Sequence, residues 1–396
     1  MFTFVIIKQQ YMNTQHILKD YLNYKETRLH GRYITFKDIE LLITELKDFC
    51  SVELLGNSEN GLPIHLIKLG TGAKPLLFWS QMHGNESTTT KALFDVLHLL
   101  KDSNNALGQQ ILKECTLYII PMLNPDGAQA YTRVNYNEVD LNRDAQERSQ
   151  AESILFKKVV DRVKPLVAFN LHGQRTIFSA GETNKNAIVS FLSPASDKER
   201  SITETRKKGM RIVAEMNTAL QTVIPGCVGR YDDGFNINCT GDTMENSGYT
   251  TILFEAGHHP EDYDREITRK WMYLSLVTSL NFIATKGVVV DGYEKYLDIP
   301  ENGKCYKDII VRNMNFNGKK KDIAIQYLES LNEGKLMFIP QIAQIETQLS
   351  DYGHIEYDCT KDKVSFSNVL ENLKVGDKVE YLSINDEIFS VFPIKK

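Results

Sequence analysis

The segment Phe78–Glu86 carries two side chains that could bind a metal ion. An apolar run that ends at Trp79 is followed by small and polar residues, and His83 and Glu86 then fall three positions apart. The apolar run predicts a strand, and open α/β sheets keep their sites at the C-terminal ends of strands. An imidazole and a carboxylate at this spacing can bind the same zinc ion, and catalytic zinc takes three protein ligands plus a water. The pair therefore predicts part of a zinc site.

Further polar fragments follow predicted strands or lie in the loops after them. In chain order they are Asn124-Pro125-Asp126-Gly127, the single Arg133, Asp140-Leu141-Asn142-Arg143, Asn170-Leu171-His172-Gly173 and Phe254-Glu255-Ala256. Strand ends bring side chains from distant sequence positions into one cleft. We therefore expect these fragments to contribute to the same site as the first pair.

In this order the fragments resemble the zinc carboxypeptidases of the carboxypeptidase A type, over roughly residues 54–285. The resemblance implies that the first pair, His83 and Glu86, binds zinc together with the later His172. It also implies one zinc ion per chain.

The same resemblance assigns roles to residues outside the metal site. Arg133 matches the arginine that polarises the scissile carbonyl, and Glu255 matches the catalytic carboxylate. Asn142 and Arg143 match the pair that holds the terminal carboxylate of the substrate. The family usually has a tyrosine on a mobile loop about twenty residues before the catalytic glutamate, and Tyr231 is the candidate here.

Elementary chemistry supports these roles independently. Three protein ligands leave a fourth zinc position for water, whose pKa falls toward about 7 on the metal. Glu255 can accept that proton and pass it to the leaving amine. Arg133 supplies positive charge for the developing oxyanion, and one such donor contributes about 3 kcal/mol. Arg143 offers a planar fork to a carboxylate, which favours chain ends over chain middles.

Three features of the chain depart from the pattern or stay outside the predicted site. Asn85 stands where the digestive enzymes have an arginine, which removes one contact to the substrate carboxylate. His258 and His259 closely follow the catalytic carboxylate, but a loop or helix-start role is predicted for them instead of metal binding. The segment 239–242, expected near the specificity pocket, does not reveal a side-chain preference.

Strands alternate with helices through the first 286 residues, which predicts an α/β sheet covered on both faces. The resemblance implies a mixed, mostly parallel sheet. Strands are expected at 64–69, 76–80, 116–121, 166–171, 187–192 and 250–254, and helices from the N-cap Thr35 to about 46, at 87–101, at 197–221 and at 260–285, with a long polar loop over 124–144. Residues 1–50 are predicted to form a helical N-terminal segment of this catalytic domain, 1–286.

The composition changes after Gly287 to short strands and turns. Strands are expected at 308–311, 322–328, 335–339, 354–359, 363–366, 378–382 and 388–392, with hairpin turns at Asn317-Gly318 and Glu333-Gly334. This pattern predicts a small all-β domain over 287–396, a sandwich or a barrel.

The composition excludes several other classes of protein. The 396 residues are 42% hydrophobic and 24% charged, with a net charge of −5, so neither nucleic acid nor a membrane is expected as a partner. Six scattered cysteines without a C-x-x-C pair are read as reduced thiols. No run approaches a membrane span, and the short apolar run at 2–7 lacks the flanks of a secretion signal. A cytoplasmic location is therefore expected.

The predicted function is a zinc-dependent exopeptidase that removes the C-terminal amino acid of a peptide or peptide-like substrate. A zinc amide hydrolase of the aspartoacylase or succinylglutamate desuccinylase kind is the first alternative, since those enzymes share several of the fragments. The intact Asn-Pro-Asp-Gly and the long sheet favour the peptidase. The second alternative is an inactive protein that binds a peptide, a wall fragment or a partner, and the complete ligand set with Glu255 argues against it.

Overall fold

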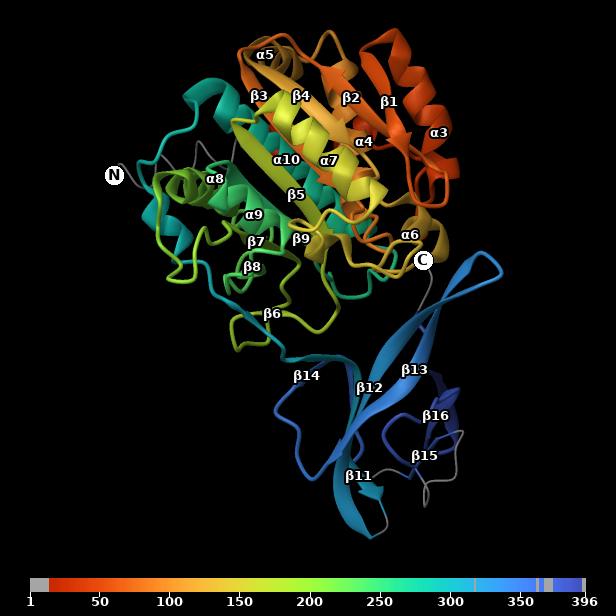
Figure 1. Ribbon diagram of the computed structural model, residues 1–396. Helices are drawn as coiled ribbons and strands as arrows, with labels where there is room; N and C mark the ends of the chain where they lie inside the picture. The colour runs from red at the N-terminus through yellow and green to blue at the C-terminus, as the bar shows by residue number, and fades with distance from the viewer. Residues whose placement is uncertain (1–13, 317, 361–362, 367–372, 394–396) are drawn as a thin grey trace.

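The computed structural model describes residues 14–316, 318–360, 363–366 and 373–393 (Figure 1). The predicted apolar run at 2–7 and Asn317 of one predicted hairpin lie outside these residues. An eight-stranded sheet forms the centre of the larger part. In spatial order its strands are β1 (Ser51–Asn57), β2 (Pro63–Leu69), β4 (Cys115–Ile120), β3 (Lys74–Ser80), β5 (Val167–Gly173), β9 (Thr250–Ala256), β7 (Val189–Leu192) and β8 (Val228–Arg230).

The central strands of this sheet run parallel. β4, β3, β5 and β9 pair in parallel, and so do β7 and β8, whereas β1, β2 and β7 join their neighbours β2, β4 and β9 in antiparallel fashion. The predicted mixed, mostly parallel sheet is confirmed. Because β3, β5 and β9 are adjacent and parallel, their C-terminal ends meet at one edge of the sheet.

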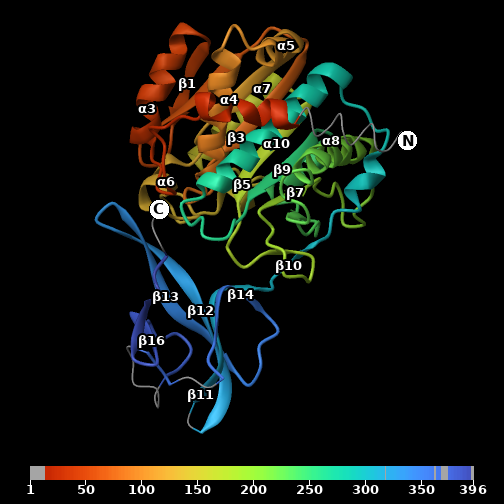
Figure 2. The same ribbon diagram turned by 180° about the vertical axis from the view of Figure 1, so that it is seen from behind.

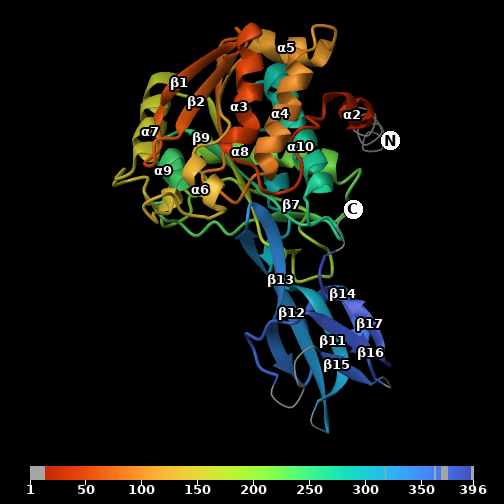
Figure 3. The same cartoon turned by 90° about the vertical axis from the view of Figure 1, so that its right-hand side faces the viewer.

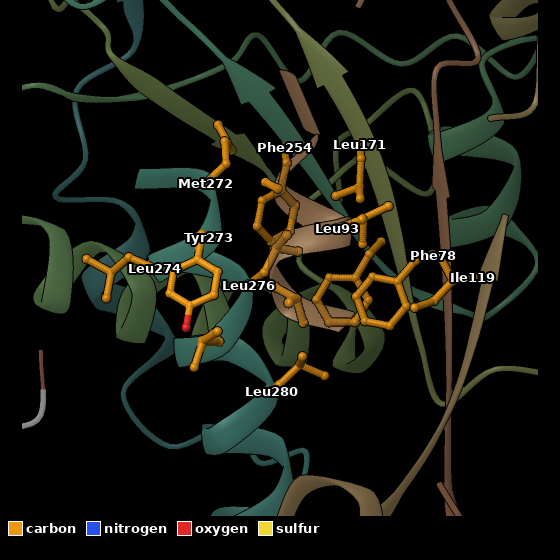
Figure 4. Packing of buried hydrophobic residues seen from close by; sticks show 14 of the residues in the cluster. Phe78, Leu93, Ile119, Leu171, Phe254, Met272, Tyr273, Leu274, Leu276 and Leu280 are labelled. Carbon is orange, nitrogen blue, oxygen red and sulfur yellow. The ribbon is translucent and has the colours of Figure 1, made fainter. Parts of the chain in front are cut away.

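Alternating side chains of β3 feed two separate cores. Leu76 and Phe78 face one side of the sheet and belong to the largest hydrophobic cluster, whereas Leu77 and Trp79 face the other side and belong to a second cluster. Phe78 stacks on Phe169 of β5 with ring centroids 4.2 Å apart. Figure 4 shows the first cluster. A strand with both faces buried reads as a continuous apolar run, which is why β3 was recognisable in the sequence.

Helices cover both faces of the sheet, as predicted (Figures 1 and 2). The α-helices are α2 (Tyr21–Tyr24), α3 (Phe36–Glu45), α4 (Thr88–Lys101), α5 (Ala106–Glu114), α6 (Pro125–Ala130), α7 (Ala151–Val163), α8 (Glu204–Leu220), α9 (Thr240–Asn246) and α10 (Glu266–Lys286), and 3₁₀ turns lie at η1 (Leu46–Asp48), η2 (Leu141–Arg143) and η3 (Tyr293–Tyr296). Residues of α4, α8 and α10 bury the first cluster, and residues of α7 and α9 bury the second. Within the described residues, no helix has the length and apolar composition of a membrane span.

Two helices begin later than the sequence predicted. The α10 helix starts at Glu266, so the acidic segment around Asp262 precedes the helix instead of forming its first turn. The Asp262 carboxylate accepts hydrogen bonds from the backbone N–H groups of Glu266, Ile267 and Thr268 at 2.8–3.0 Å, which satisfies donors that the first turn leaves free. Similarly, α8 starts after Thr203, whose hydroxyl accepts from a first-turn N–H group.

The loop predicted over 124–144 is not wholly irregular. It contains α6 and the turn η2. Asn124 is the N-cap of α6 and Pro125 fills its first position, where a missing N–H group costs nothing. A six-residue helix has too few turns to leave a periodic apolar pattern, so the sequence alone did not reveal it.

Several elements were not anticipated from the sequence: β1, α5, α7, β8 and α9. The edge strand β1 is mostly exposed, so it lacks the alternation of buried and exposed positions that identifies a half-buried strand. By contrast, α3 begins at its predicted N-cap, Thr35, whose backbone N–H donates to the Asp38 carboxylate at 2.7 Å.

The predicted all-β character of the C-terminal region is confirmed, and its strands form two sheets (Figure 3). The four-stranded sheet has the order β13 (Lys335–Glu346), β12 (Lys319–Asn332), β11 (Tyr306–Phe316) and β14 (Tyr352–Asp358), and the three-stranded sheet has the order β15 (Val364–Phe366), β16 (Tyr381–Ile384) and β17 (Glu387–Ser390). Both sheets contribute to one hydrophobic cluster. The segment before them still contacts the larger part, where β10 (Asn302–Gly303) pairs with β6 (Ser179–Ala180). The domain division after residue 286 remains a prediction.

The long β12–β13 hairpin contacts the larger part of the molecule (Figures 1 and 2). Its Glu329 carboxylate accepts hydrogen bonds from Arg32 at 2.5 Å and from the Tyr131 hydroxyl at 2.8 Å. In β11, the buried Asp308 accepts from the Tyr263 hydroxyl at 2.7 Å. Charged and polar side chains therefore fix the two C-terminal sheets, called the β region from here on, against the larger part of the molecule.

A buried ion pair joins α4 to α10. Arg269 donates to Asp95 through Nη2 at 2.5 Å and through Nε at 2.8 Å, and both side chains are 0% exposed. Arg269 also donates to the carbonyls of Glu26 and Leu29 in the N-terminal segment. The pair thus holds three separate parts of the chain together.

Removing one partner of this pair should destabilise the protein strongly. In Arg269→Met the buried Asp95 charge loses its partner, and we expect the free energy of unfolding to fall by about 3–5 kcal/mol. Urea unfolding followed by circular dichroism measures the change. As a matched control, Lys157→Met removes the cation from the exposed Lys157–Asp161 pair on α7 and should cost less than about 0.5 kcal/mol. Equal losses in the two variants would contradict the structural role of the buried pair.

Candidate active site

Three adjacent strand ends bring the candidate site together. His172 lies near the end of β5 and is paired directly with Glu255 of the neighbouring strand β9. On the other side of β5, Ser80 at the end of β3 pairs with Leu171, and His83 follows three residues later. The parallel register thus brings residues 83, 172 and 255 to one edge of the sheet, although they are far apart in sequence.

The turn that carries His83 and Glu86 is held by close backbone packing. The Glu86 N–H donates to the His83 carbonyl at 3.1 Å. Gly84 lies against Gly127, and a Cβ atom at position 84 would lie 1.9 Å from the carbonyl carbon of Gly127, so only glycine fits there. Asn124 donates to the Met82 carbonyl at 3.1 Å and accepts from the Gly127 N–H at 2.8 Å. The Asn-Pro-Asp-Gly fragment therefore anchors this turn.

The side chains of His83, Glu86 and His172 converge on one point. The two Nδ1 atoms are 3.0 Å apart, and the Glu86 oxygens lie 2.9 Å from each of them. These three residues form the group of candidate metal ligands found within the described residues, and both histidines are 2% exposed. The Gly173 N–H also donates to Glu86 at 3.0 Å, which fixes the carboxylate.

This donor set fits a zinc ion. Two imidazole nitrogens and a carboxylate supply the number and types of ligands that catalytic zinc takes. The Glu86 carboxylate and the two Nδ1 atoms lie 3.0 Å or less apart, close enough to bind one cation together. Burial lowers the pKa of His83, but the carboxylates of Glu86 and Asp140 raise it more, so the pKa lies above its ordinary value. The same negative surroundings favour a metal ion.

Asp140 is a candidate site residue to which the sequence analysis gave no role. Its Oδ1 lies 3.2 Å from Nε2 of His83, and its Oδ2 accepts from Nε of Arg133 at 2.9 Å. A hydrogen bond from Nε2 to this carboxylate keeps Nδ1 unprotonated and aimed at the metal position. The sequence did single out the fragment that begins with Asp140 and contains Asn142 and Arg143. Only the contact with His83 shows that Asp140 can orient that imidazole.

Glu255 is buried beside the candidate metal ligands. Its side chain is 8% exposed, and Oε2 has no hydrogen-bond partner among the described residues. Burial, followed by the negative charge of Glu86, raises the pKa of Glu255 well above its ordinary value, while Arg133 and Arg265 oppose the shift. A carboxylate with a free oxygen at this position is suited to exchanging a proton with a small molecule in the cavity.

The two arginines and the asparagine predicted for the site lie around the candidate metal position. The Arg133 side chain is 47% exposed, and its Nη1 lies 3.8 Å from Glu86. Arg143 donates to the carbonyl of Asn142 and to Sγ of Cys239 instead of to a carboxylate. The Asn142 side chain accepts from the Thr240 N–H at 2.9 Å, which ties the turn η2 to α9.

Tyr231 directly follows β8, and its N–H donates to the Phe191 carbonyl at 2.9 Å. Its ring lies 5.6 Å from that of Phe178. Burial and then the charge of Glu255 raise the pKa of the phenol, so Tyr231 keeps its proton at neutral pH and can donate a hydrogen bond.

A single cavity of about 470 Å³ joins all eight predicted site residues: His83, Glu86, Arg133, Asn142, Arg143, His172, Tyr231 and Glu255. His258 and His259, which were left out of the predicted site, do not line this cavity. The ring of His258 instead contacts the ring of Tyr263, which precedes α10, and the ring of His354 on β14.

Residues 37–205 match the model of the family described as zinc carboxypeptidase. Carboxypeptidase SOL1 of Arabidopsis thaliana is 32% identical over 124 residues, which cover 28% of this chain and 25% of that protein. Carboxypeptidase B of Astacus astacus is 35% identical over 101 residues, which cover 24% of this chain and 31% of that protein. The match therefore spans less than a third of either curated relative.

Solved structures agree on the fold. The metallo-carboxypeptidase from Burkholderia cenocepacia is similar with a TM-score of 0.52 at 17% identity, covering 63% of this chain and 69% of that one. Carboxypeptidase A from Helicoverpa armigera has a TM-score of 0.52 at 15% identity, covering 70% of this chain and 80% of that one. The fold is that of the metallo-carboxypeptidases. The family model itself covers residues 37–205, which is less than half of this chain.

Metal analysis tests the ligand set. We expect the purified protein to bind about one zinc ion per chain, and His83→Ala or His172→Ala to lose it, because two remaining ligands hold zinc poorly. Asp140→Asn should keep the metal but weaken binding by about 10- to 100-fold in a chelator competition. His259→Ala is the matched control and should bind zinc normally. Full zinc content in both ligand variants would show that other residues bind the metal.

Proposed function

We propose that this protein is a zinc-dependent carboxypeptidase that releases the C-terminal amino acid of peptides. The observation that carries the proposal is the shared cavity, in which a His-Glu-His donor set, the buried Glu255 and the fork of Arg143 face one space. Such a cavity combines a centre for hydrolysis with a cation for a chain end. The family match of residues 37–205 supports the same class of reaction.

A bound zinc ion would be held by His83, Glu86 and His172 and would supply a Lewis acid that polarises water and the scissile carbonyl. Glu255 accepts a proton from the attacking water through its free Oε2 and then donates a proton to the leaving amine. Arg133 contributes positive charge for the oxyanion. Its Nε is held by Asp140 and its Nη1 lies 3.3 Å from Nδ1 of His83, so the half-exposed Arg133 side chain offers Nη2 to the substrate.

Recognition of the chain end is assigned to Arg143 and Asn142. The Arg143 guanidinium is exposed and donates to neutral acceptors, so it can pair with a carboxylate without breaking an ion pair. Asn142 adds a neutral amide beside it, and the Tyr231 phenol adds a donor within the same cavity. Paired donors of this kind favour a terminal carboxylate over an internal peptide bond.

A zinc hydrolase of small N-acyl amino acids is the second candidate. It would use the same donor set, the same Glu255 and the same carboxylate-binding residues. The size of the site favours the peptidase, because a second cavity of about 360 Å³ also contacts Glu86 and Arg133 and extends beyond the metal position. A small acyl group would leave that second cavity empty.

The proposed general base is tested by Glu255→Gln. This substitution preserves the size of the side chain and removes its capacity to accept a proton, so turnover should fall about 100-fold or more. Zinc content and the substrate dissociation constant should stay near their original values. Steady-state kinetics, metal analysis and calorimetry measure the three quantities. Hydrolysis at the original rate would make Glu255 a structural residue.

Amidated peptides test recognition of the chain end. Replacing the C-terminal carboxylate by an amide leaves the Arg143 fork unpaired, so kcat/KM should fall by roughly 30- to 1000-fold. Arg143→Ala should remove most of this difference between acid and amide. Kinetic assays with N-blocked dipeptides and their amides provide the measurement.

The length of the accepted acyl group separates the two candidate functions. A carboxypeptidase should hydrolyse an N-blocked dipeptide at least as well as an N-acetyl or N-succinyl amino acid. Hydrolysis confined to the small N-acyl amino acids would overturn the carboxypeptidase assignment and leave the zinc chemistry in place.

A further inference from the structure

A second cavity of about 360 Å³ lies between the larger part of the molecule, which carries the candidate site and is called the catalytic part below, and the β region. One wall comes from β12 and contains Tyr327, Leu328 and Glu329, and the other wall includes Gly173 and Gln174 from the end of β5 and the segment after it. Glu86 and Arg133 line both this cavity and the one that holds Glu255. The two cavities are therefore neighbours that share residues at the candidate metal centre.

The lining of the second cavity is rich in arginine. It contains Arg32, Arg133, Arg175 and Arg265, with Glu86 and Glu329 as its acidic members. Both acidic groups are already engaged, because Glu86 faces the candidate metal position and Glu329 is paired with Arg32 at 2.5 Å. The remaining arginines give this wall an excess of positive charge.

Two of these arginines have no carboxylate partner among the described residues. Arg265 is 2% exposed and donates to the carbonyls of Ala256, Gly257 and Gln174, and its buried Nε–H has no acceptor. Arg175 is exposed, lines both cavities, and makes no hydrogen bond or ion pair within the described part of the chain. An arginine free of intramolecular partners can pair with a ligand at no cost to the fold.

The path of a bound peptide through the two cavities follows from the proposed function, and the inference below rests on that function. If the terminal carboxylate lies at Arg143 in the first cavity, the peptide must continue past the metal centre on its N-terminal side. The second cavity begins there, at Glu86 and Arg133. The residue before the scissile bond therefore lies where the two cavities meet, which is also where Arg175 lies.

We infer that the cavity between the catalytic part and the β region selects substrates with an acidic residue immediately before the scissile bond, and that Arg175 pairs with its carboxylate. Arg265 adds a buried positive charge to the same wall. The chemical class of the substrate is thus a peptide with an anionic acyl side. Because β12 forms the opposite wall, the β region contributes directly to substrate selection.

Three N-acetyl tripeptides that differ only at the penultimate residue provide the test. The variable residue is glutamate, glutamine or lysine, and the C-terminal residue is the one that the full chain releases fastest from neutral peptides. We expect kcat/KM for the glutamate peptide to exceed that for the lysine peptide by about 10-fold or more at low ionic strength, and the ratio to shrink with added salt.

Arg175→Gln tests the residue itself. Because Arg175 is exposed and makes no hydrogen bond or ion pair with the described residues, the variant should remain folded. It should reduce the glutamate-to-lysine ratio about fivefold and leave kcat/KM for the glutamine peptide within about twofold. Arg162→Gln is the matched control, since Arg162 is an exposed arginine on α7 that pairs with Glu53 of β1, and it should leave the ratio unchanged.

A binding measurement separates failure of this inference from failure of the proposed function. The dissociation constants of the three peptides are measured by calorimetry on the full-length, zinc-loaded Glu255→Gln protein, with and without Arg175→Gln. Tighter binding of the glutamate peptide that depends on Arg175 supports the inference even where no peptide is hydrolysed. Hydrolysis or binding that ignores the charge of the penultimate residue, or a preference that survives Arg175→Gln, would overturn it.

Discussion

The close approach of two imidazole nitrogens and a carboxylate at the end of the central sheet is the constraint on which the site depends. His83, Glu86 and His172 bring three potential ligand atoms to one point, where a single cation can bind. The surrounding structure opposes relaxation of this cluster. The Asp140 carboxylate contacts Nε2 of His83 at 3.2 Å, and Gly84 packs so closely against Gly127 that no larger side chain fits between the two loops. Rigid support of this kind keeps a metal site preorganised.

The same strand ends determine how the site is used. Because β5 pairs directly with β9, a candidate ligand and a buried carboxylate become neighbours without any loop between them. The first cavity extends from this centre toward Arg143, and the second extends toward the β region. The two cavities therefore differ in their lining, since Arg143 lines the first and four arginines line the second. The β region is part of this cleft through residues of β12.

Local sequence patterns predicted the elements whose burial is uniform or periodic. The buried strands β3 and β9 were readable as apolar runs, and α3 was readable from Thr35 and its amphipathic spacing. The start of α10 was misplaced, because the Asp262 carboxylate caps the helix from outside its first turn. The exposed edge strand β1 and the six-residue helix α6 left no periodic signal. In each case the local sequence lacks the periodic apolar pattern from which an element and its bounds can be read.

The sequence by itself determined which chemical groups the candidate site can contain and their order, because side-chain identity decides whether a residue can bind a metal, exchange a proton or carry a positive charge. It also predicted that strand ends would collect them, and the eight predicted residues do line one cavity. Only the tertiary structure assigned Asp140 to His83, since that contact joins residues 57 positions apart. Likewise, only the packing of β12 against the catalytic part created the wall that faces Arg175. Distances between segments remote in sequence depend on how the whole chain packs, and no local pattern encodes them.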